Sequence, residues 1–237
     1  MSTQFSNLGL SSSICEALEK KGYTKPTPIQ EKAIPLILKD KDVMASAQTG
    51  TGKTAGFTLP IIQKLLTQPK AHANTTKVLV LTPTRELAAQ IQEQVELYGA
   101  NTYIRSTVVF GGVSINPQMM KLRKGVEILI ATPGRLLDLY NQKAIRFTDL
   151  TTLVLDEADR MADMGFMEPV CKILDQCKKD RQTILFSATL DDEVADLVRD
   201  YQTNPVTIEV GPKEVTMESM THYFCLMPNS KKSSISS

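Results

Sequence analysis

The sequence predicts an α/β fold in which a mainly parallel β-sheet carries helices on both faces. Short apolar runs rich in Val, Ile and Leu alternate with longer amphipathic stretches along most of the 237 residues. Strands that are apolar on both faces, separated by helix-length segments, are typical of a parallel sheet buried between two helical layers. Hydrophobic residues make up 42% of the chain and charged residues 22%, as in one large globular domain with or without tails.

The expected elements alternate along the chain. The predicted strands are 43–46, 77–81, 106–109, 127–131, 152–156, 183–187 and 206–209. The predicted helices are 53–66, 84–98, 117–124, 133–141, 168–178 and 192–201. We expect a surface loop over 68–76, and disorder at the polar, Ser- and Lys-rich end 228–237.

The charge balance argues against a broad electrostatic surface for nucleic acid. The chain has 27 basic and 26 acidic residues, a net charge of +1, so any nucleic-acid site must be local. Residues 1–13 lack the basic and apolar regions of a secretory signal. No apolar run approaches the ~20 residues that span a bilayer. We therefore expect no membrane partner.

Cysteine usage indicates a reducing compartment. The four cysteines, Cys15, Cys171, Cys177 and Cys225, form no C-x-x-C pair, and the chain has only two histidines. This pattern disfavours a zinc site and a disulfide framework. It favours free thiols in the cytoplasm or, alternatively, the nucleus.

The segment 47–54, Ala-Gln-Thr-Gly-Thr-Gly-Lys-Thr, is predicted to bind a triphosphate between a strand and a helix. Gly50 and Gly52 let the backbone curl so that its N–H groups face phosphate oxygens, and the following helix adds its dipole. Lys53 places a cation on the outer phosphates, and Thr54 offers a hydroxyl to magnesium. The pattern G-x-x-x-x-G-K-[ST] is nearly matched, with Ala47 at the first glycine position.

An acidic tetrad, 156–159, closes a later apolar strand. Asp156 is suited to hold Mg²⁺, largely through water, because magnesium prefers few carboxylates and several waters. Glu157 is then free to polarise an attacking water. Together with the phosphate loop, the tetrad predicts a nucleotide hydrolase whose catalytic residues are Lys53, Asp156 and Glu157.

Six polar turns each follow a predicted strand. In parallel sheets ligands collect at the carboxyl ends of the strands, so these turns should share one rim. Packing alone would instead scatter Gly, Pro and Thr over both rims. The turns are 47–54, 83–86, 111–112, 132–135, 156–157 and 187–189.

The order of these turns resembles that in DEAD-box RNA helicases, and 22–30 with the earlier Phe5 resembles the Q motif of that family. The likeness covers roughly the first 210 residues. It implies an α/β RecA-like P-loop NTPase domain, the first of the two in the family. The implied division is a Q-motif region 1–40 packed on the core, a RecA-like ATP-binding domain 41–212, and an interdomain linker with a disordered tail over 213–237.

The resemblance assigns the nucleotide-binding residues. Tyr23 would stack on adenine, Phe5 would pack behind the Q segment, and Gln30 would match the adenine edge with its donor and acceptor. The full set implied for ATP is Tyr23, Lys25, Gln30, Ala47, Gln48, Thr49, Gly50, Thr51, Gly52, Lys53 and Thr54. Thr54 and Asp156 would hold Mg²⁺.

The resemblance also implies an RNA groove. Helix starts at Thr84 and Thr132 leave N–H groups free for phosphates, and Arg85 and Arg135 add cations unless they pair with carboxylates. Contacts of this kind position the RNA backbone, single-stranded or duplex, without reading sequence. The full set is Pro83, Thr84, Arg85, Gly111, Gly112, Thr132, Pro133, Gly134 and Arg135.

A further turn is implied to couple the two sites. Ser187 and Thr189 have hydroxyls that can hydrogen-bond Asp159 at the end of the tetrad. The family also needs a second RecA-like domain whose arginines reach the γ-phosphate, and no His-Arg-x-Gly-Arg pattern occurs in this chain. We therefore expect a monomer that needs the second domain, with weak nucleotide binding, very low turnover and no unwinding from these residues alone.

Two alternatives remain open from the sequence. The chain could be a binding module that holds nucleotide or RNA as a clamp without catalysis. It could also be another phosphate-loop enzyme, such as a small-molecule kinase. The Q-like segment and the two Thr/Pro/Arg turns argue against a kinase.

Overall fold

Seven strands form one sheet in which every hydrogen-bonded pair runs parallel. The computed structural model describes residues 4–48 and 50–210. Thr49, Cys225 and the predicted linker and tail, 213–237, lie outside these ranges. The sheet order is β3-β4-β2-β5-β6-β1-β7, which confirms the predicted α/β class. The strands are β1 (Val43–Ser46), β2 (Thr76–Leu81), β3 (Ser106–Val109), β4 (Val126–Ala131), β5 (Thr152–Leu155), β6 (Gln182–Ser187) and β7 (Val206–Glu209).

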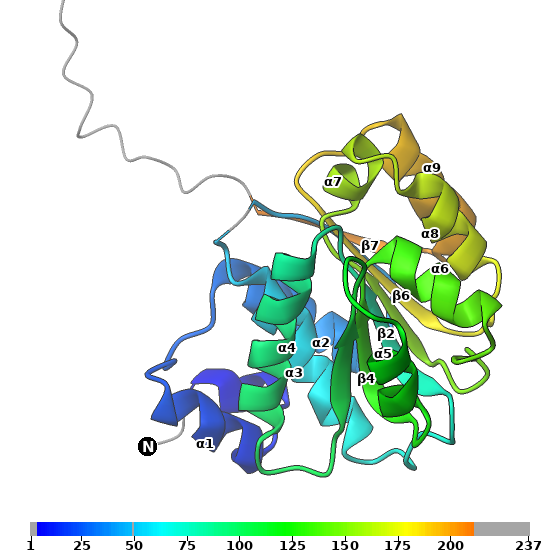
Figure 1. Cartoon of the computed structure of the whole chain (residues 1–237). Coiled ribbons are helices and arrows are strands. Elements are labelled where there is room, and N and C mark those ends of the chain that lie inside the picture. The colour runs from blue at the N-terminus through cyan, green and yellow to red at the C-terminus, as the bar shows by residue number, and fades with distance from the viewer. Residues whose placement is uncertain (1–3, 49, 211–237) are drawn as a thin grey trace, which may run out of the picture.

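Helices cover both faces of this sheet (Figure 1). One face carries a short 3₁₀ helix and four α-helices: η1 (Gln4–Leu8), α1 (Ser12–Lys20), α2 (Pro28–Leu38), α3 (Lys53–Leu65) and α4 (Arg85–Gly99). The other carries α5 (Asn116–Leu122), α6 (Pro133–Asn141), α7 (Ala158–Asp163), α8 (Met167–Leu174) and α9 (Asp192–Tyr201). Within the described ranges, none of these helices combines the length and apolar character needed to cross a membrane.

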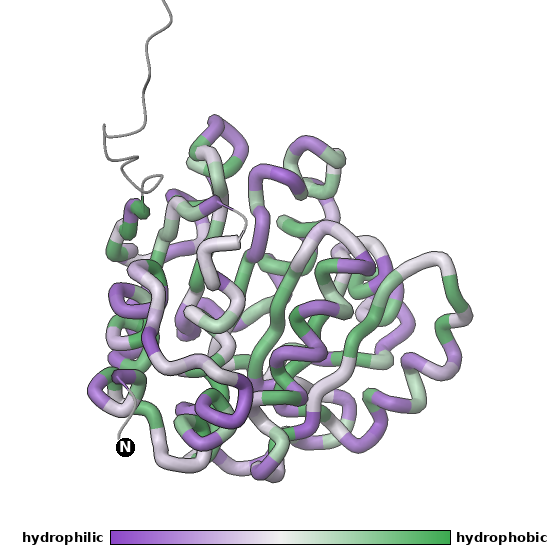
Figure 2. Tube along the Cα trace, turned by 90° about the vertical axis from the view of Figure 1, so that its left-hand side faces the viewer, coloured by the Kyte–Doolittle hydropathy of each residue, from purple (hydrophilic) through white to green (hydrophobic). Residues whose placement is uncertain are grey.

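Side-chain alternation along the strands builds two cores, one on each face. In β2, Val78 and Val80 point to the face of α1–α4, whereas Leu79 and Leu81 point to the face of α5–α9. Figure 2 shows the apolar residues concentrated along the central strands and alternating with polar ones along the helices. A continuous apolar run is therefore required in each central strand, which is why these runs are visible in the sequence.

The residues before β1 belong to the same core as the sheet. Phe5, Ile14, Leu18 and Ile34 are buried in the cluster that also holds the α3 side chains. Two signals mark α2: Thr27 precedes its first turn and Pro28 occupies its first position, where the missing N–H costs nothing.

The structure corrects several predicted boundaries and adds four helices. The segments η1, α1, α2 and α7 were absent from the predicted elements. The helix expected over 168–178 ends at Leu174, and the chain then turns so that Cys177 packs into the core. The helix expected over 117–124 ends at Leu122, before Gly125 at φ 72°. Cys15, Cys171 and Cys177 are free thiols.

The segment expected as a surface loop, 68–76, is partly buried. Thr76 begins β2, and Ala71 and Thr75 are buried. Asp149 fixes this segment: its carboxylate accepts hydrogen bonds from His72 N at 3.0 Å and from Thr75 Oγ1 at 2.8 Å. The His72 Nδ1 atom lies 2.6 Å from the same oxygen. Partial burial would raise the pKa of Asp149, but these hydrogen bonds outweigh it and lower the pKa to about 2.

Replacing Asp149 by Asn should lower the free energy of unfolding by about 1–3 kcal/mol at pH 7, because Thr75 and the exposed His72 lose a charged acceptor. A lowered folded-state pKa stabilises the fold above the usual pKa of 3.8, and this contribution disappears as the pH falls toward 2. Urea unfolding of wild type and variant at pH 7 and near pH 2 should therefore show a difference that shrinks in acid. The exposed Asp163→Asn is the control, and a gap independent of pH would contradict the prediction.

Candidate nucleotide site and RNA face

The strand order divides the carboxyl rim of the sheet into two halves. β5, β6 and β1 are neighbours, so the turns after them, which hold the acidic tetrad, 187–189 and the phosphate loop, lie together. β3, β4 and β2 form the other half, so the turns 111–112, 132–135 and 83–86 also lie together. The two halves meet where β2 pairs with β5, at Leu81 opposite Leu155.

The phosphate loop leaves β1 and enters α3 through two left-handed glycines. Gly50 and Gly52 both have φ 82°, a conformation that strains any residue with a Cβ. Gly52 has a second restriction, because a Cβ there would lie 2.5 Å from the Gln30 amide nitrogen. The loop is anchored at its start by a hydrogen bond from Ala47 N to Ser187 O at 3.1 Å.

Lys53, the first residue of α3, lies between the two carboxylates of the tetrad. Its Nζ is 3.2 Å from Asp156 Oδ1 and 3.2 Å from Glu157 Oε1, and all three side chains are largely buried. Burial raises the pKa of Asp156, and the charge of Glu157 adds to the rise while that of Lys53 opposes it. The site thus holds one cation against two acids, at the place where a phosphate tail would enter.

Glu157 adopts a left-handed backbone conformation, with φ 54° and ψ 52°. This conformation costs a non-glycine residue about 1–3 kcal/mol. The described residues contain four other non-glycine cases, Asp40, Asn74, Lys143 and Asn204, and among the five only Glu157 lines the cavity. The turn at Glu157 lies between β5 and α7. Because of it, the Glu157 carboxylate contacts Lys53 even though Glu157 is the residue directly after Asp156, which contacts Lys53 as well. Arg160, one turn along α7, donates to Glu157 Oε2 at 3.3 Å.

The donor set fits a magnesium ion that takes its other ligands from a nucleotide and from water. Asp156 Oδ1 is buried with the Lys53 ammonium, 3.2 Å away, as its contact, and Thr54 lines the same cavity. Among residues 4–48 and 50–210 there is no cluster of three or more His, Cys, Asp or Glu side chains placed for a metal. Mg²⁺ suits such a sparse set, because it keeps several waters and binds phosphates.

These residues line a cavity of about 430 Å³ between the Q segment, the phosphate loop and α4. The cavity brings together many of the residues predicted to bind ATP and metal: Tyr23, Lys25, Gln30, Gly50, Gly52, Lys53, Thr54, Asp156 and Glu157. Phe5 is buried and also lines it. Ala47, Gln48 and Thr51 belong to the same loop but are not part of the lining. Tyr23 is 51% exposed, so one face of its ring is open to a stacking partner.

Gln30 connects the Q segment to the phosphate loop. Its Oε1 accepts from Thr27 N at 3.0 Å, and its Nε2 donates to Gly52 O at 3.0 Å. An amide carries two donor hydrogens and two acceptor lone pairs, so one of each is still available for a base. Gln30 therefore helps to fix the phosphate loop in addition to the base contact predicted for it.

One wall of the cavity was not predicted. It consists of α4 side chains at helical spacing, Leu87, Gln90, Ile91, Gln94 and Tyr98. Burial raises the pKa of Tyr98 to about 12, and the nearby Tyr23 adds to the rise, so its hydroxyl stays protonated. A signal was present in the sequence, since Gln90, Gln94 and Tyr98 recur every four residues on one helix face.

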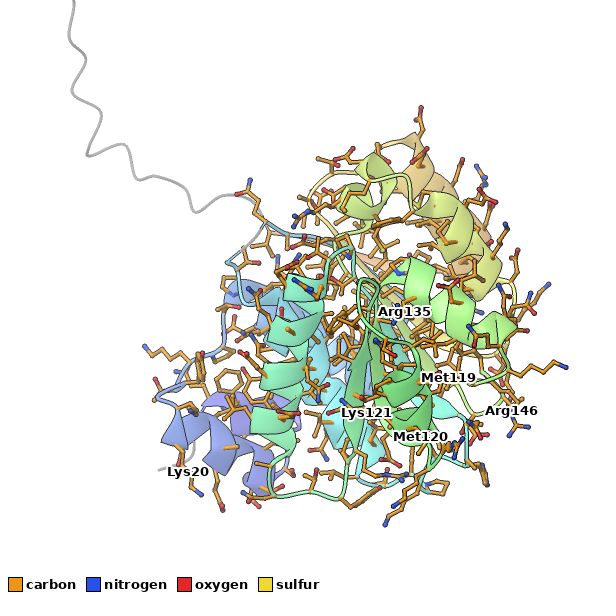
Figure 3. The ribbon with its side chains drawn as sticks, viewed as in Figure 1. Lys20, Met119, Met120, Lys121, Arg135 and Arg146 are labelled. Carbon is orange, nitrogen blue, oxygen red and sulfur yellow. The ribbon has the colours of Figure 1, made fainter. Side chains whose placement is uncertain are left out.

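The other half of the rim exposes glycines and cations. Gly111, Gly112 and Gly134 are exposed. Arg135 Nη2 donates to Val113 O at 2.7 Å, whereas its Nη1 is buried and has no hydrogen-bond partner in the part of the chain that the structure describes. Figure 3 shows Arg135 at the start of α6, above Met119 and Met120 of α5. Arg135 thus keeps one buried donor that no acceptor of the described residues satisfies.

The remaining residues predicted for RNA have mixed roles. Arg85 lies over the Phe110 ring, 5.8 Å from its centroid, with its Nε 3.5 Å from Glu86. Thr84 caps α4 by accepting from Leu87 N at 3.3 Å. Thr132 precedes α6 without a side-chain cap bond. Pro83 and Pro133 are buried, so their side chains support the turns from inside and do not form the surface.

The turn after β6 contacts Asp159. The Asp159 carboxylate accepts from the backbone N of Ala188 and of Thr189, both at 3.2 Å, and from Thr189 Oγ1 at 3.4 Å. Ser187 also contacts Asp159, but through the backbone: its Oγ accepts a hydrogen bond from Asp159 N at 3.1 Å. The tetrad and the turn 187–189 are therefore tied by four hydrogen bonds.

A glycine loop at a helix start, a buried acidic pair and a parallel sheet define a P-loop nucleotide-binding domain. The family model for the DEAD/DEAH box helicase matches residues 27–197. An ATP-dependent RNA helicase CshA from Limosilactobacillus reuteri is 43% identical over 222 residues, 93% of this chain and 44% of that relative. A DEAD-box ATP-dependent RNA helicase CshA from Streptococcus pneumoniae serotype 4 (strain ATCC BAA-334 / TIGR4) is 41% identical, covering 97% of this chain and 43% of the relative.

The chain belongs to the DEAD/DEAH box helicase family. The solved structure of a DEAD box protein from the hyperthermophile Methanococcus jannaschii superimposes with a TM-score of 0.80 at 39% identity, over 86% of this chain and 55% of that one. This likeness confirms the RecA-like α/β fold. The chain spans less than half the length of the curated relatives it matches.

Replacing Lys53 by Met should lower the free energy of unfolding by about 3 kcal/mol, because two buried carboxylates lose their cation. The loss should be larger at pH 8 than at pH 5. The raised pKa of Asp156 would rise further without Lys53, and a folded state that binds a proton more tightly than the unfolded state loses stability as the pH rises. Urea unfolding at the two pH values measures this. The control is Lys172→Met, which removes an exposed partner of Glu168; equal losses at both pH values would contradict the prediction.

Proposed function

We propose that this chain is the ATP-binding N-terminal domain of a DEAD-box RNA helicase. In the complete protein, ATP hydrolysis would be coupled to RNA binding and to local duplex unwinding. The observation that carries the proposal is a single cavity in which the Q segment, the phosphate loop and the acidic pair meet. The names of the curated relatives, ATP-dependent RNA helicases, support the same activity.

The chemistry follows from the charges of the cavity. Lys53 would exchange part of its contact with Asp156 and Glu157 for the outer phosphates of ATP. Thr54 and Asp156 would hold Mg²⁺, which neutralises charge on the phosphates when bound. Glu157 would then orient and polarise the attacking water. At the other end, Tyr23 would stack on adenine.

The half of the rim formed by β3, β4 and β2 would bind the RNA backbone. The support is the exposed pair Gly111 and Gly112, the exposed Gly134 and the free donor of Arg135. Backbone contacts of this kind carry no sequence information and weaken as salt rises. Asp159, Ser187 and Thr189 would couple the two halves, because their hydrogen bonds tie the tetrad to β6.

The complete protein would supply the missing transition-state charge from a second RecA-like domain. Within the described cavity the lining side chains include Lys25 and Lys53 but no arginine. An arginine supplied by another domain accelerates related nucleotidases by roughly 10³–10⁵. We therefore propose low turnover for the 237 residues alone, and a monomeric protein of the cytoplasm, where ATP and RNA are both present.

Glu157→Gln should abolish hydrolysis but leave ATP binding nearly intact. The amide keeps the shape of the side chain and cannot polarise water, so single-turnover hydrolysis with RNA should fall at least about 100-fold. The ATP dissociation constant should change by less than about 3-fold. Asp163→Asn is the matched control on the exposed end of α7. Unchanged hydrolysis in Glu157→Gln, or robust unwinding by the 237-residue chain, would contradict the proposal.

Arg135→Ala should weaken RNA binding equally for unrelated sequences and reduce the salt slope by about 1, as the loss of one phosphate contact requires. Arg146→Ala is a matched control, because Arg146 also donates to a backbone carbonyl but lies far from Arg135 in Figure 3. Fluorescence titration of two RNA sequences at three salt concentrations measures both effects. A loss confined to one sequence, or equal losses in the two variants, would speak against this RNA face.

A further inference from the structure

The α4 side chains that line the cavity extend over a distance comparable to the length of a nucleotide. Leu87 stands near the rim, and Tyr98 stands beside Tyr23 at the Q segment. At 1.5 Å per residue, the helix covers about 16 Å between these two side chains. Gln94 lies one turn before Tyr98 on α4. It lines the same cavity as Thr27 and Gln30 of the Q segment, where the proposed function places the nucleoside.

Two residues of the same cavity have a buried side-chain oxygen that accepts nothing within the described residues apart from the Lys53 ion pair: Gln94 Oε1 and Asp156 Oδ1. The Asp156 oxygen is accounted for by Lys53 and by the metal proposed above. The Gln94 oxygen has no such explanation. A buried acceptor left without a donor costs about 1–3 kcal/mol, and a ligand donor in the cavity would remove that cost.

The chemistry of the missing donor can be stated. Phosphate oxygens only accept hydrogen bonds, so the triphosphate cannot satisfy a carbonyl oxygen. A nucleoside offers two kinds of donor, the exocyclic amino group of adenine and the ribose hydroxyls. Gln30 has already used one donor and one acceptor within the protein, which leaves room for a second residue in nucleoside recognition.

We propose that Gln94 determines nucleoside specificity by accepting, through Oε1, a hydrogen bond from the adenine amino group or a ribose hydroxyl of ATP. The inference rests on the proposed function for its ligand. Gln94 lies on α4, outside every motif identified in the sequence. It would act together with the residues of the Q segment that are proposed to contact the nucleoside. Tyr98, whose hydroxyl stays protonated, completes the wall beside it.

The test is the Gln94→Met variant of the 237-residue chain, which removes the amide but keeps a flexible, helix-favouring side chain. Dissociation constants for ATP, 2′-deoxy-ATP, 3′-deoxy-ATP and N6,N6-dimethyl-ATP are measured by calorimetry. We expect a 3- to 10-fold weaker affinity for ATP, the size of one hydrogen bond. One of the three analogues lacks the donor that Gln94 contacts. The wild type and the variant should bind that analogue with equal affinity, and this result identifies the donor.

The control is Gln92→Met. Gln92 lies on the same helix and also has a buried, unpartnered Oε1, but it lines a separate hollow near β3. Its affinity for ATP should stay within 2-fold of wild type. The inference is overturned if Gln94→Met binds ATP like wild type, or if it loses all four nucleotides equally, which would indicate packing alone.

Failure of the inference can be told from failure of the proposed function. If wild type binds ATP, Lys53→Met binds it at least 10-fold more weakly, and Gln94→Met is unchanged, only the role of Gln94 is lost. If wild type binds none of the four nucleotides in the presence of magnesium, both proposals are overturned.

Discussion

The site depends on one buried cation held between two acids. Lys53 opens α3, while Asp156 and Glu157 close β5, so the contact joins the first and the fifth strand of the chain across β6. A buried lysine is costly without partners, and two buried carboxylates repel each other without a cation. Each group therefore keeps the others in place. The resulting position lies at the N-terminus of α3, directly after the left-handed glycines Gly50 and Gly52.

The order of the strands explains how one small domain keeps the two halves of its carboxyl rim apart. The turns after β1 and β5 hold the buried Lys53, Asp156 and Glu157 contact, whereas those after β3 and β4 expose Gly111, Gly112 and Gly134. Only the β2–β5 pair, Leu81 beside Leu155, joins the halves within the sheet. A second connection crosses the helical layer, because α4 begins after Thr84, in the turn that follows β2, and carries Tyr98 of the cavity wall near its end.

The sequence was most informative where residue chemistry and strand pattern coincide. Buried parallel strands must be apolar on both faces, so all seven were predicted within one residue at each end. The phosphate loop and tetrad were predicted because glycines, a lysine and carboxylates have few alternative uses in that spacing. By contrast, α7 has only six residues and its start is a strained Glu157, a signal that periodicity cannot show. The α4 wall was not predicted, because Gln90 and Gln94 have the pattern of ordinary polar residues on a helix surface. Only the structure shows that they line the same cavity as the Q segment.

The left-handed turn at Glu157 sets stability against chemistry at a single position. Glycine or asparagine would adopt φ 54° more readily, so the backbone conformation by itself favours replacing this residue. The carboxylate at that turn, however, is the group that contacts Lys53 at 3.2 Å. Relaxing the backbone here therefore exposes a buried ammonium to the loss of one of its two acidic neighbours, so the strain and the ion pair have to be kept or lost together.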